Sequence, residues 1–136
     1  MGVSVSRFKG KRIPITGGSS GMGLAGAQRI VTEGGHVAIT GLNEERLERA
    51  RSLLPAASII LKSDAANEAD IHGLGEAIND WGSLDGLLLN GGFAEAGSPE
   101  SVTADSFNRM MNVNVRGRCY SWQPSPNRSI QARPFW

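Results

Sequence analysis

The stretch Thr16-Gly17-Gly18-Ser19-Ser20-Gly21-Met22-Gly23 decides the fold of this chain. It follows a short apolar run, residues 13–15, and it opens an apolar-periodic segment that extends to about Glu33. Glycine gives such a turn backbone angles that a side chain disfavours, and the missing Cβ atoms let an anion approach the main chain. A helix that starts here offers free N–H groups and the positive end of its dipole. Strand, glycine-rich turn and helix in this order therefore predict a binding site for the phosphates of a dinucleotide.

Strand and helix patterns alternate along the rest of the chain, which predicts an α/β fold with a parallel sheet and right-handed crossovers. Because proline lacks a ladder donor, Pro14 predicts a short or distorted first strand, and Asn43 is expected to cap the second helix. We expect strands at 13–15, 36–40, 58–62 and 84–89, and helices at 22–33, 43–54, 67–81 and 103–116. From about Cys119 the chain has three prolines and no periodicity, which predicts coil.

Composition narrows the classes of partner. One domain is the natural interpretation of 136 residues, of which 40% are apolar. The net charge is only +1 and no basic patch carries interleaved aromatics, so nucleic acid is not an expected partner. No apolar run approaches the roughly 20 residues of a membrane span, and no metal site is predicted. A single cysteine, Cys119, and the absence of a signal-peptide pattern favour a cytoplasmic location.

Four motifs occur in order at fitting intervals. They are Thr16-Gly17-x-x-x-Gly21-x-Gly23, Asp64-Ala65 after the third predicted strand, Asn90-Gly91-Gly92 after the fourth, and Val113-Asn114-Val115-Arg116-Gly117. Together they resemble the short-chain dehydrogenase/reductase family over residues 8–117. The overlapping pattern GxGxxG at 21–26 is a less suitable register, because Gly17 rather than Gly21 follows the strand directly.

The resemblance implies a Rossmann-like, doubly wound parallel sheet. It is incomplete here, with about four strands and four helices in residues 1–118, followed by an irregular, coil-like tail over 119–136. The residues that it implies for cofactor binding are Gly17, Ser19, Ser20, Gly21, Met22, Gly23, Asp64, Ala65, Asn90, Gly91 and Gly92.

The end of the second strand predicts which cofactor binds. An acid there holds the ribose 2′-hydroxyl of NAD and repels the 2′-phosphate of NADP. This chain has Gly41 where relatives that use NAD often carry Asp, and Leu42 where relatives that use NADP often carry Arg. The missing acid favours NADP over NAD. Arg46 is either a partner of the 2′-phosphate or a solvated helix residue, and the second interpretation is favoured.

Asn114 lies on the same helical stripe as three apolar residues, Phe107, Met110 and Met111. A buried amide without partners costs about 1–3 kcal/mol, so its position needs a reason. One interpretation is a core asparagine that binds a neighbouring strand. The family resemblance implies a catalytic role instead, in which the asparagine holds a water of the proton relay behind the catalytic lysine.

The remaining catalytic residues of the family are a serine on a fifth strand and a Tyr-x-x-x-Lys pair. Here the single tyrosine, Tyr120, is followed four residues later by Pro124, and all three lysines lie upstream of it. The resemblance implies an oxidoreductase that transfers hydride between NADP and a small carbonyl or alcohol, and pairing of copies through helices such as 103–116. We expect the 136 residues alone to be inactive. The alternatives are a non-catalytic nucleotide-binding module and a non-functional truncation product.

Overall fold

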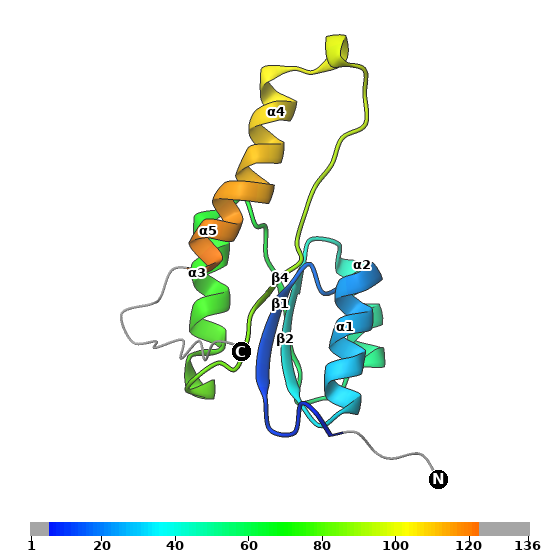
Figure 1. Cartoon of the computed structure of the whole chain (residues 1–136), viewed down its shortest axis with the longest axis vertical. Coiled ribbons are helices and arrows are strands. Elements are labelled where there is room, and N and C mark those ends of the chain that lie inside the picture. The colour runs from blue at the N-terminus through cyan, green and yellow to red at the C-terminus, as the bar shows by residue number, and fades with distance from the viewer. Residues whose placement is uncertain (1–5, 123–136) are drawn as a thin grey trace.

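A parallel sheet of four strands, in the order β3-β2-β1-β4, forms the centre of the molecule (Figure 1). The computed structural model describes residues 6–122. Its main elements are β1 (Arg12–Thr16), α1 (Gly21–Thr32), β2 (His36–Gly41), α2 (Glu44–Leu53), β3 (Ile59–Lys62), α3 (Glu68–Ala77), β4 (Leu88–Leu89), α4 (Ala104–Met111) and α5 (Gly117–Trp122). A π-helical segment, Asn112–Arg116, joins α4 to α5.

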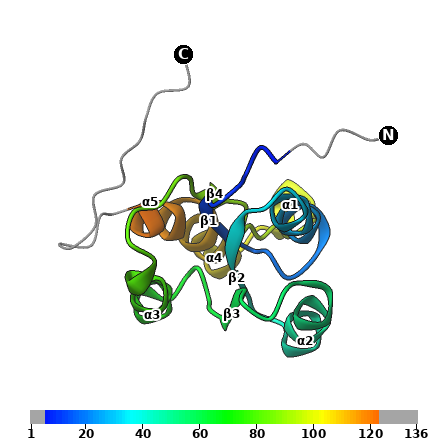
Figure 2. The same ribbon diagram turned by 90° about the horizontal axis from the view of Figure 1, so that it is seen from below.

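Helices cover both faces of the sheet, as Figure 2 shows: α1 and α2 lie on one face, and α3 and α5 lie on the other. The side chains of β2 alternate between the two faces, because Val37 and Ile39 join the core under α1 and α2, whereas Ala38 joins the core under α3. A strand buried on both faces is typical of a doubly wound sheet. The predicted Rossmann-like α/β architecture is confirmed.

Pro14 does not shorten the first strand. β1 has five residues, and its register with β2 runs through the proline without interruption, with Pro14 opposite Ala38. β4 pairs with β1 only at Ile15 and Thr16, beyond the proline. The prediction of a distorted first strand is therefore wrong for the edge of β1 that pairs with β2.

The fourth strand is shorter than predicted and begins at Leu88 rather than Leu84. Leu84 is buried, but it packs into the core beside α3 instead of pairing with β1. The carboxylate of Asp85 accepts hydrogen bonds from Lys11 Nζ and from the backbone N–H of Arg12, both at 2.9 Å. The backbone N–H of Asp85 also donates to the carbonyl of Arg12 at 3.0 Å, so a single backbone bond and the Asp85 side chain hold this segment beside β1 without a continuous ladder.

The prediction of coil from Cys119 is wrong for Cys119–Trp122, which belong to α5. The helix continues through Gly117, whose carbonyl accepts a hydrogen bond from Ser121 Oγ at 2.8 Å. The first helix-breaking proline, Pro124, comes only after α5, and residues 123–136 lie outside the described part of the chain. Within residues 6–122, no helix is both long and apolar enough to cross a membrane.

Candidate functional site

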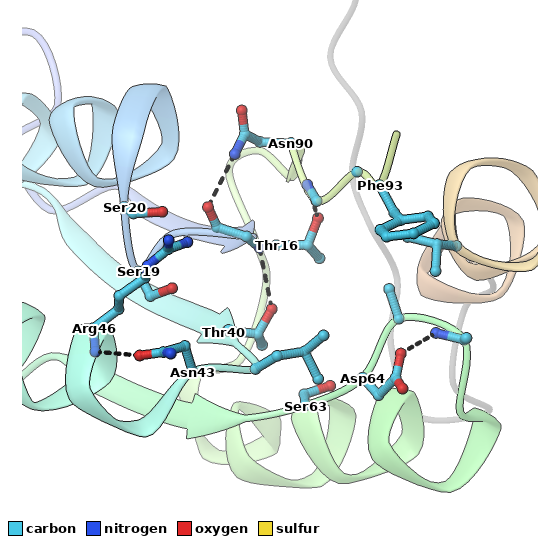
Figure 3. Close-up of a pocket in the computed structure, with 18 of the residues that line it drawn as sticks. Thr16, Ser19, Ser20, Thr40, Asn43, Arg46, Ser63, Asp64, Asn90 and Phe93 are labelled. Atoms are coloured by element: carbon cyan, nitrogen blue, oxygen red, sulfur yellow. Dashed lines mark hydrogen bonds between the residues drawn. The ribbon is translucent and has the colours of Figure 1, made fainter. Parts of the chain in front are cut away.

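A cleft of about 380 Å³ opens at the carboxyl ends of the strands (Figure 3). Loops that follow all four strands line it. It collects nine of the residues that the sequence predicted for cofactor binding: Gly17, Ser19, Ser20, Met22, Asp64, Ala65, Asn90, Gly91 and Gly92. Gly21, Gly23 and Asn114 are not among its lining residues.

The glycines that do not line the cleft shape the turn behind it. Gly21 has a φ of +53°, and a Cβ atom added there would meet no atom within 4 Å. A Cβ atom on Gly23 would overlap the carbonyl oxygen of Gly17 and lie 2.6 Å from Nδ2 of Asn90. The turn therefore needs glycine at 21 for its backbone angle and at 23 for close packing, which agrees with the predicted motif register.

The start of α1 differs from the starts of α2, α3 and α4. Its N-cap residue, Ser20, makes no side-chain cap hydrogen bond, and its first turn has no acidic residue. By contrast α2, α3 and α4 have side-chain caps and acidic first turns, with caps from Asn43, Asn67 and Thr103. The start of α1, where Ser20 and Met22 line the cleft, therefore keeps the positive end of its dipole uncompensated, which is an arrangement that binds an anion.

Hydrogen bonds between strand ends hold the turn in place (Figure 3). Asn90 Nδ2 donates to the carbonyl of Gly17 at 3.0 Å, and the N–H of Gly91 donates to Thr16 Oγ1 at 3.0 Å. Thr40 Oγ1 accepts from the N–H of Gly17 at 3.4 Å. The two threonines are buried; Thr16 is the first residue of the predicted glycine motif, whereas Thr40 was not predicted. Polar residues at the carboxyl ends of apolar strands were the available signal.

The end of β2 presents no carboxylate to the cleft, where Gly41, Leu42, Asn43 and Arg46 form the wall. Arg46 is exposed, as a solvated helix residue would be, but it also lines the cleft. Figure 3 shows its side chain extending from α2 towards Ser19. Within residues 6–122 its guanidinium group forms no ion pair.

Asp64 lies at the opposite wall, in a turn with fixed geometry. Its Oδ1 accepts a hydrogen bond from the N–H of Ala66 at 2.8 Å, and its own N–H donates to Asp70 Oδ2 at 2.8 Å. The carboxylate is half-buried and lines the cleft. The turn therefore holds one acid towards the cleft.

Asn114 binds the loop that follows β4. Its Oδ1 accepts from the N–H of Phe93 at 2.9 Å, and its Nδ2 donates to the carbonyl of the same residue at 2.6 Å. The amide is thus satisfied by neighbouring backbone, in a loop rather than in a strand. Its catalytic role stays a prediction.

Several lining residues escaped the sequence analysis. Phe93 lines the cleft, and the guanidinium carbon of Arg109 lies 4.3 Å from the centre of its ring. Val113 adds an apolar side chain from the π-helical segment. These contacts join residues far apart in sequence, so spacing gave no signal for them. Among the described residues, no cluster of His, Cys, Asp and Glu suits a metal ion.

A family model described as short chain dehydrogenase matches residues 11–123. The match includes α5, so the similarity extends beyond Gly117, where the sequence motifs end. The chain is 37% identical over 116 residues to glucose 1-dehydrogenase of Gluconobacter oxydans, a match that covers 82% of this chain and 44% of the relative. It is also 37% identical over 116 residues to 2-(S)-hydroxypropyl-CoM dehydrogenase 3 of Xanthobacter autotrophicus, covering 82% of this chain and 46% of that protein. The chain spans about half the length of the curated relatives that it matches.

Solved structures show the same architecture. A double mutant of a Serratia marcescens short-chain dehydrogenase/reductase superposes with a TM-score of 0.77 at 32% identity, over 84% of this chain and 49% of that chain. A blue fluorescent protein from a metagenomic library, in complex with NADPH, gives a TM-score of 0.76 at 30% identity, over 83% of this chain and 49% of that chain.

Proposed function

Because this chain belongs to the short-chain dehydrogenase family, whose model matches residues 11–123, we propose that its cleft binds NADP for hydride transfer to or from a small carbonyl or alcohol. The family binds NAD or NADP, and the choice of NADP is the finer part of the proposal. The observation that carries the binding of a dinucleotide is the start of α1 at the cleft, which has no side-chain cap and no acidic residue in its first turn.

The glycine turn suits the cofactor's phosphates. The N–H groups at the start of α1 are free to donate, and the hydroxyls of Ser19 and Ser20 lie beside them in the cleft wall. The open space beside Gly21 lets a ligand approach the backbone there. Donors and dipole act together on the same anion.

The other wall suits the adenosine half. Asp64 and Ala65 line it from the turn after β3, while Asn90 and Gly91 line it from the loop after β4. Val113 adds an apolar surface. A carboxylate, an amide and an apolar side chain provide both hydrogen bonds and packing for a purine base.

The end of β2 favours NADP over NAD. No carboxylate there would bind the ribose 2′-hydroxyl or repel a 2′-phosphate. Arg46 lines this part of the cleft without an ion-pair partner in the described residues, and its five N–H donors suit a phosphate. We assign it the 2′-phosphate, in place of the solvated role that the sequence favoured.

The nicotinamide ring, when bound, carries the hydride. This chain's residues bind and orient the cofactor, and Asn114 fixes Phe93 through both backbone groups. By family resemblance, Asn114 also holds a water of the proton relay. The 136 residues contain no Tyr-x-x-x-Lys sequence, so alone they are proposed to bind NADP without reducing a carbonyl.

The proposal extends to the setting of the protein. The substrate is a small molecule, and nucleic acid is not a partner. The location is the cytoplasm, and copies associate through α4. Composition and family resemblance support these points.

Fluorescence titration with NADPH and NADH tests the cofactor assignment. We expect saturable binding of both, with NADPH at least tenfold tighter. Equal or tighter binding of NADH would contradict the choice of NADP. An NADPH-consumption assay with ketones, aldehydes and quinones tests inactivity. Binding without turnover supports the proposal for these 136 residues, and any turnover that Gly21→Ala abolishes contradicts it. A folded chain without binding would support the alternative of a non-functional product.

A further inference from the structure

Gly117 lies where a helix crosses the turn that carries Asp64. It is buried at the start of α5, immediately after the π-helical segment. A Cβ atom at this position would overlap the carbonyl oxygen of Ala65 and lie 2.9 Å from its carbonyl carbon. Both atoms are backbone, so no side chain could move aside. The helix reaches this turn only because residue 117 has no side chain.

The turn that Gly117 contacts is a wall of the cleft. Asp64 and Ala65 line the cleft, and the N–H of Asn67 donates to the carbonyl of Asp64 at 2.9 Å. The hydrogen bonds of Asp64 to Ala66 and Asp70 make the turn a compact unit. A displacement of the turn at Ala65 would therefore move the Asp64 carboxylate with it.

The same helical stretch also contacts the loop after β4. Asn114, three residues before Gly117, holds Phe93 of that loop through two hydrogen bonds. Arg116 adds a weak contact to the start of α3, because its Nη2 lies 3.9 Å from Oε2 of Glu68. Residues 114–117 thus contact two segments that line the cleft, the turn after β3 and the loop after β4.

We infer that Gly117 is a positioning residue of the nucleotide site: it sets the place of the Asp64–Ala65 turn, and with it the width of the adenosine end of the cleft, without touching the ligand. This inference rests on the proposed binding of NADP. The substitution Gly117→Ala forces the helix and the turn apart.

The test compares two parts of the cofactor. The unmodified chain and Gly117→Ala are titrated by calorimetry with adenosine 2′-monophosphate and with pyrophosphate, which the glycine turn is proposed to bind. We expect Gly117→Ala to weaken binding of adenosine 2′-monophosphate by tenfold or more, and to change binding of pyrophosphate by less than twofold. A general destabilisation of the fold would reduce the affinities for both ligands by the same factor. The control is Gly73→Ala in α3, where an added Cβ meets no atom within 4 Å and both affinities should stay unchanged.

The possible results distinguish a failure of this inference from a failure of the proposed NADP binding. An unmodified chain that binds neither NADPH nor adenosine 2′-monophosphate overturns the proposed function, and the inference with it. An unmodified chain that binds, while folded Gly117→Ala binds adenosine 2′-monophosphate equally well, overturns the inference alone. An equal loss of affinity for both ligands in Gly117→Ala also overturns the inference.

A second measurement, hydrogen exchange in the unmodified chain, tests the inference even if Gly117→Ala does not fold. In the unmodified chain, saturating adenosine 2′-monophosphate should slow hydrogen exchange in residues 117–121, although Gly117 does not line the cleft. Unchanged exchange there, with slower exchange in residues 64–67, would show that the turn does not depend on the helix and would overturn the inference.

Discussion

Asn90 Nδ2 donates a hydrogen bond of 3.0 Å to the carbonyl oxygen of Gly17, a residue 73 positions earlier in the chain. This bond ties the end of β4 to the glycine turn after β1. Gly23 packs against both partners, since a Cβ atom there would overlap the Gly17 oxygen and crowd the Asn90 amide. The turn and the loop after β4 therefore form one unit at the cleft.

Asn90→Ala should loosen this unit. The substitution leaves the half-buried Gly17 carbonyl without its donor, a loss of about 1–3 kcal/mol in the free energy of unfolding. NADPH affinity should fall as well, because the turn that binds the phosphates loses its support. Chemical denaturation and NADPH titration measure the two effects. Asn79→Ala, at an exposed position outside the cleft, is the control and should change neither. An Asn90→Ala chain with unchanged affinity would contradict the role of this bond.

Gly21→Ala tests the phosphate site with a matched control. Gly21 (φ +53°) and Gly10 (φ +69°) both have left-handed backbone angles, and an added Cβ meets no atom within 4 Å at either. Each substitution should therefore cost a similar amount of folding free energy, about 1–2 kcal/mol. Only Gly21 adjoins the uncapped start of α1, so only Gly21→Ala should weaken NADPH binding, by tenfold or more. Equal affinities of the two variants would place the phosphates elsewhere.

Arg46→Gln should change the choice between cofactors. Charge-assisted hydrogen bonds contribute about 1.5–3 kcal/mol, so the substitution should weaken NADPH binding by about tenfold or more and leave NADH binding unchanged. The measured quantity is the ratio of the two dissociation constants. Arg49→Gln, on the same helix but outside the cleft, should preserve that ratio. A preserved ratio in Arg46→Gln would return Arg46 to the role of a solvated helix residue.

Glu33 should make stability depend on pH. Hydrogen bonds from Arg7 and the charge of Arg29 lower the pKa of this carboxyl from its ordinary value of 4.5 to about 2. A lowered pKa means that the carboxylate stabilises the fold above about pH 4.5, and that this contribution is lost as the pH falls towards 2. The melting temperature of Glu33→Gln should therefore lie below that of the unmodified chain at pH 7, and the gap should close in acid.

The control for this experiment is Glu95→Gln. Glu95 lies in the loop after β4, is exposed, and forms no ion pair within residues 6–122. Its melting temperature should follow that of the unmodified chain at every pH. A gap for Glu33→Gln that stays constant between pH 7 and pH 2 would contradict the assignment.

Local patterns predicted most of the fold. The strand, turn and helix from Arg12 to Thr32 occur where the apolar spacing placed them, and Asn43 caps α2 by accepting from the N–H of Arg46 at 2.9 Å. The predictions that were wrong, such as the start of the fourth strand, concern residues whose positions are set by tertiary contacts. Leu84 is apolar because it packs beside α3, not because it pairs in a strand.

In the candidate site, too, local motifs were predictive and tertiary contacts were not predicted. The motifs predicted the residues of the glycine turn and the Asn90 loop, because short loops at strand ends carry their chemistry in sequence. The contact of Arg109 with Phe93 and the hydrogen bonds of Asn114 to Phe93 join segments that only the fold brings together. The approach of Gly117 to Ala65 belongs to the same class.

Thermal melting of the unmodified chain with increasing NADPH tests the central claim most directly. A ligand that binds only the folded state adds about 2.7 kcal/mol of stability at a concentration of 100 times its dissociation constant. We predict one cooperative transition whose midpoint rises steadily with NADPH, and a smaller rise at each NADPH concentration for Gly21→Ala. A cooperative transition that NADPH leaves in place, at any concentration up to millimolar, would contradict the claim that this cleft binds a dinucleotide.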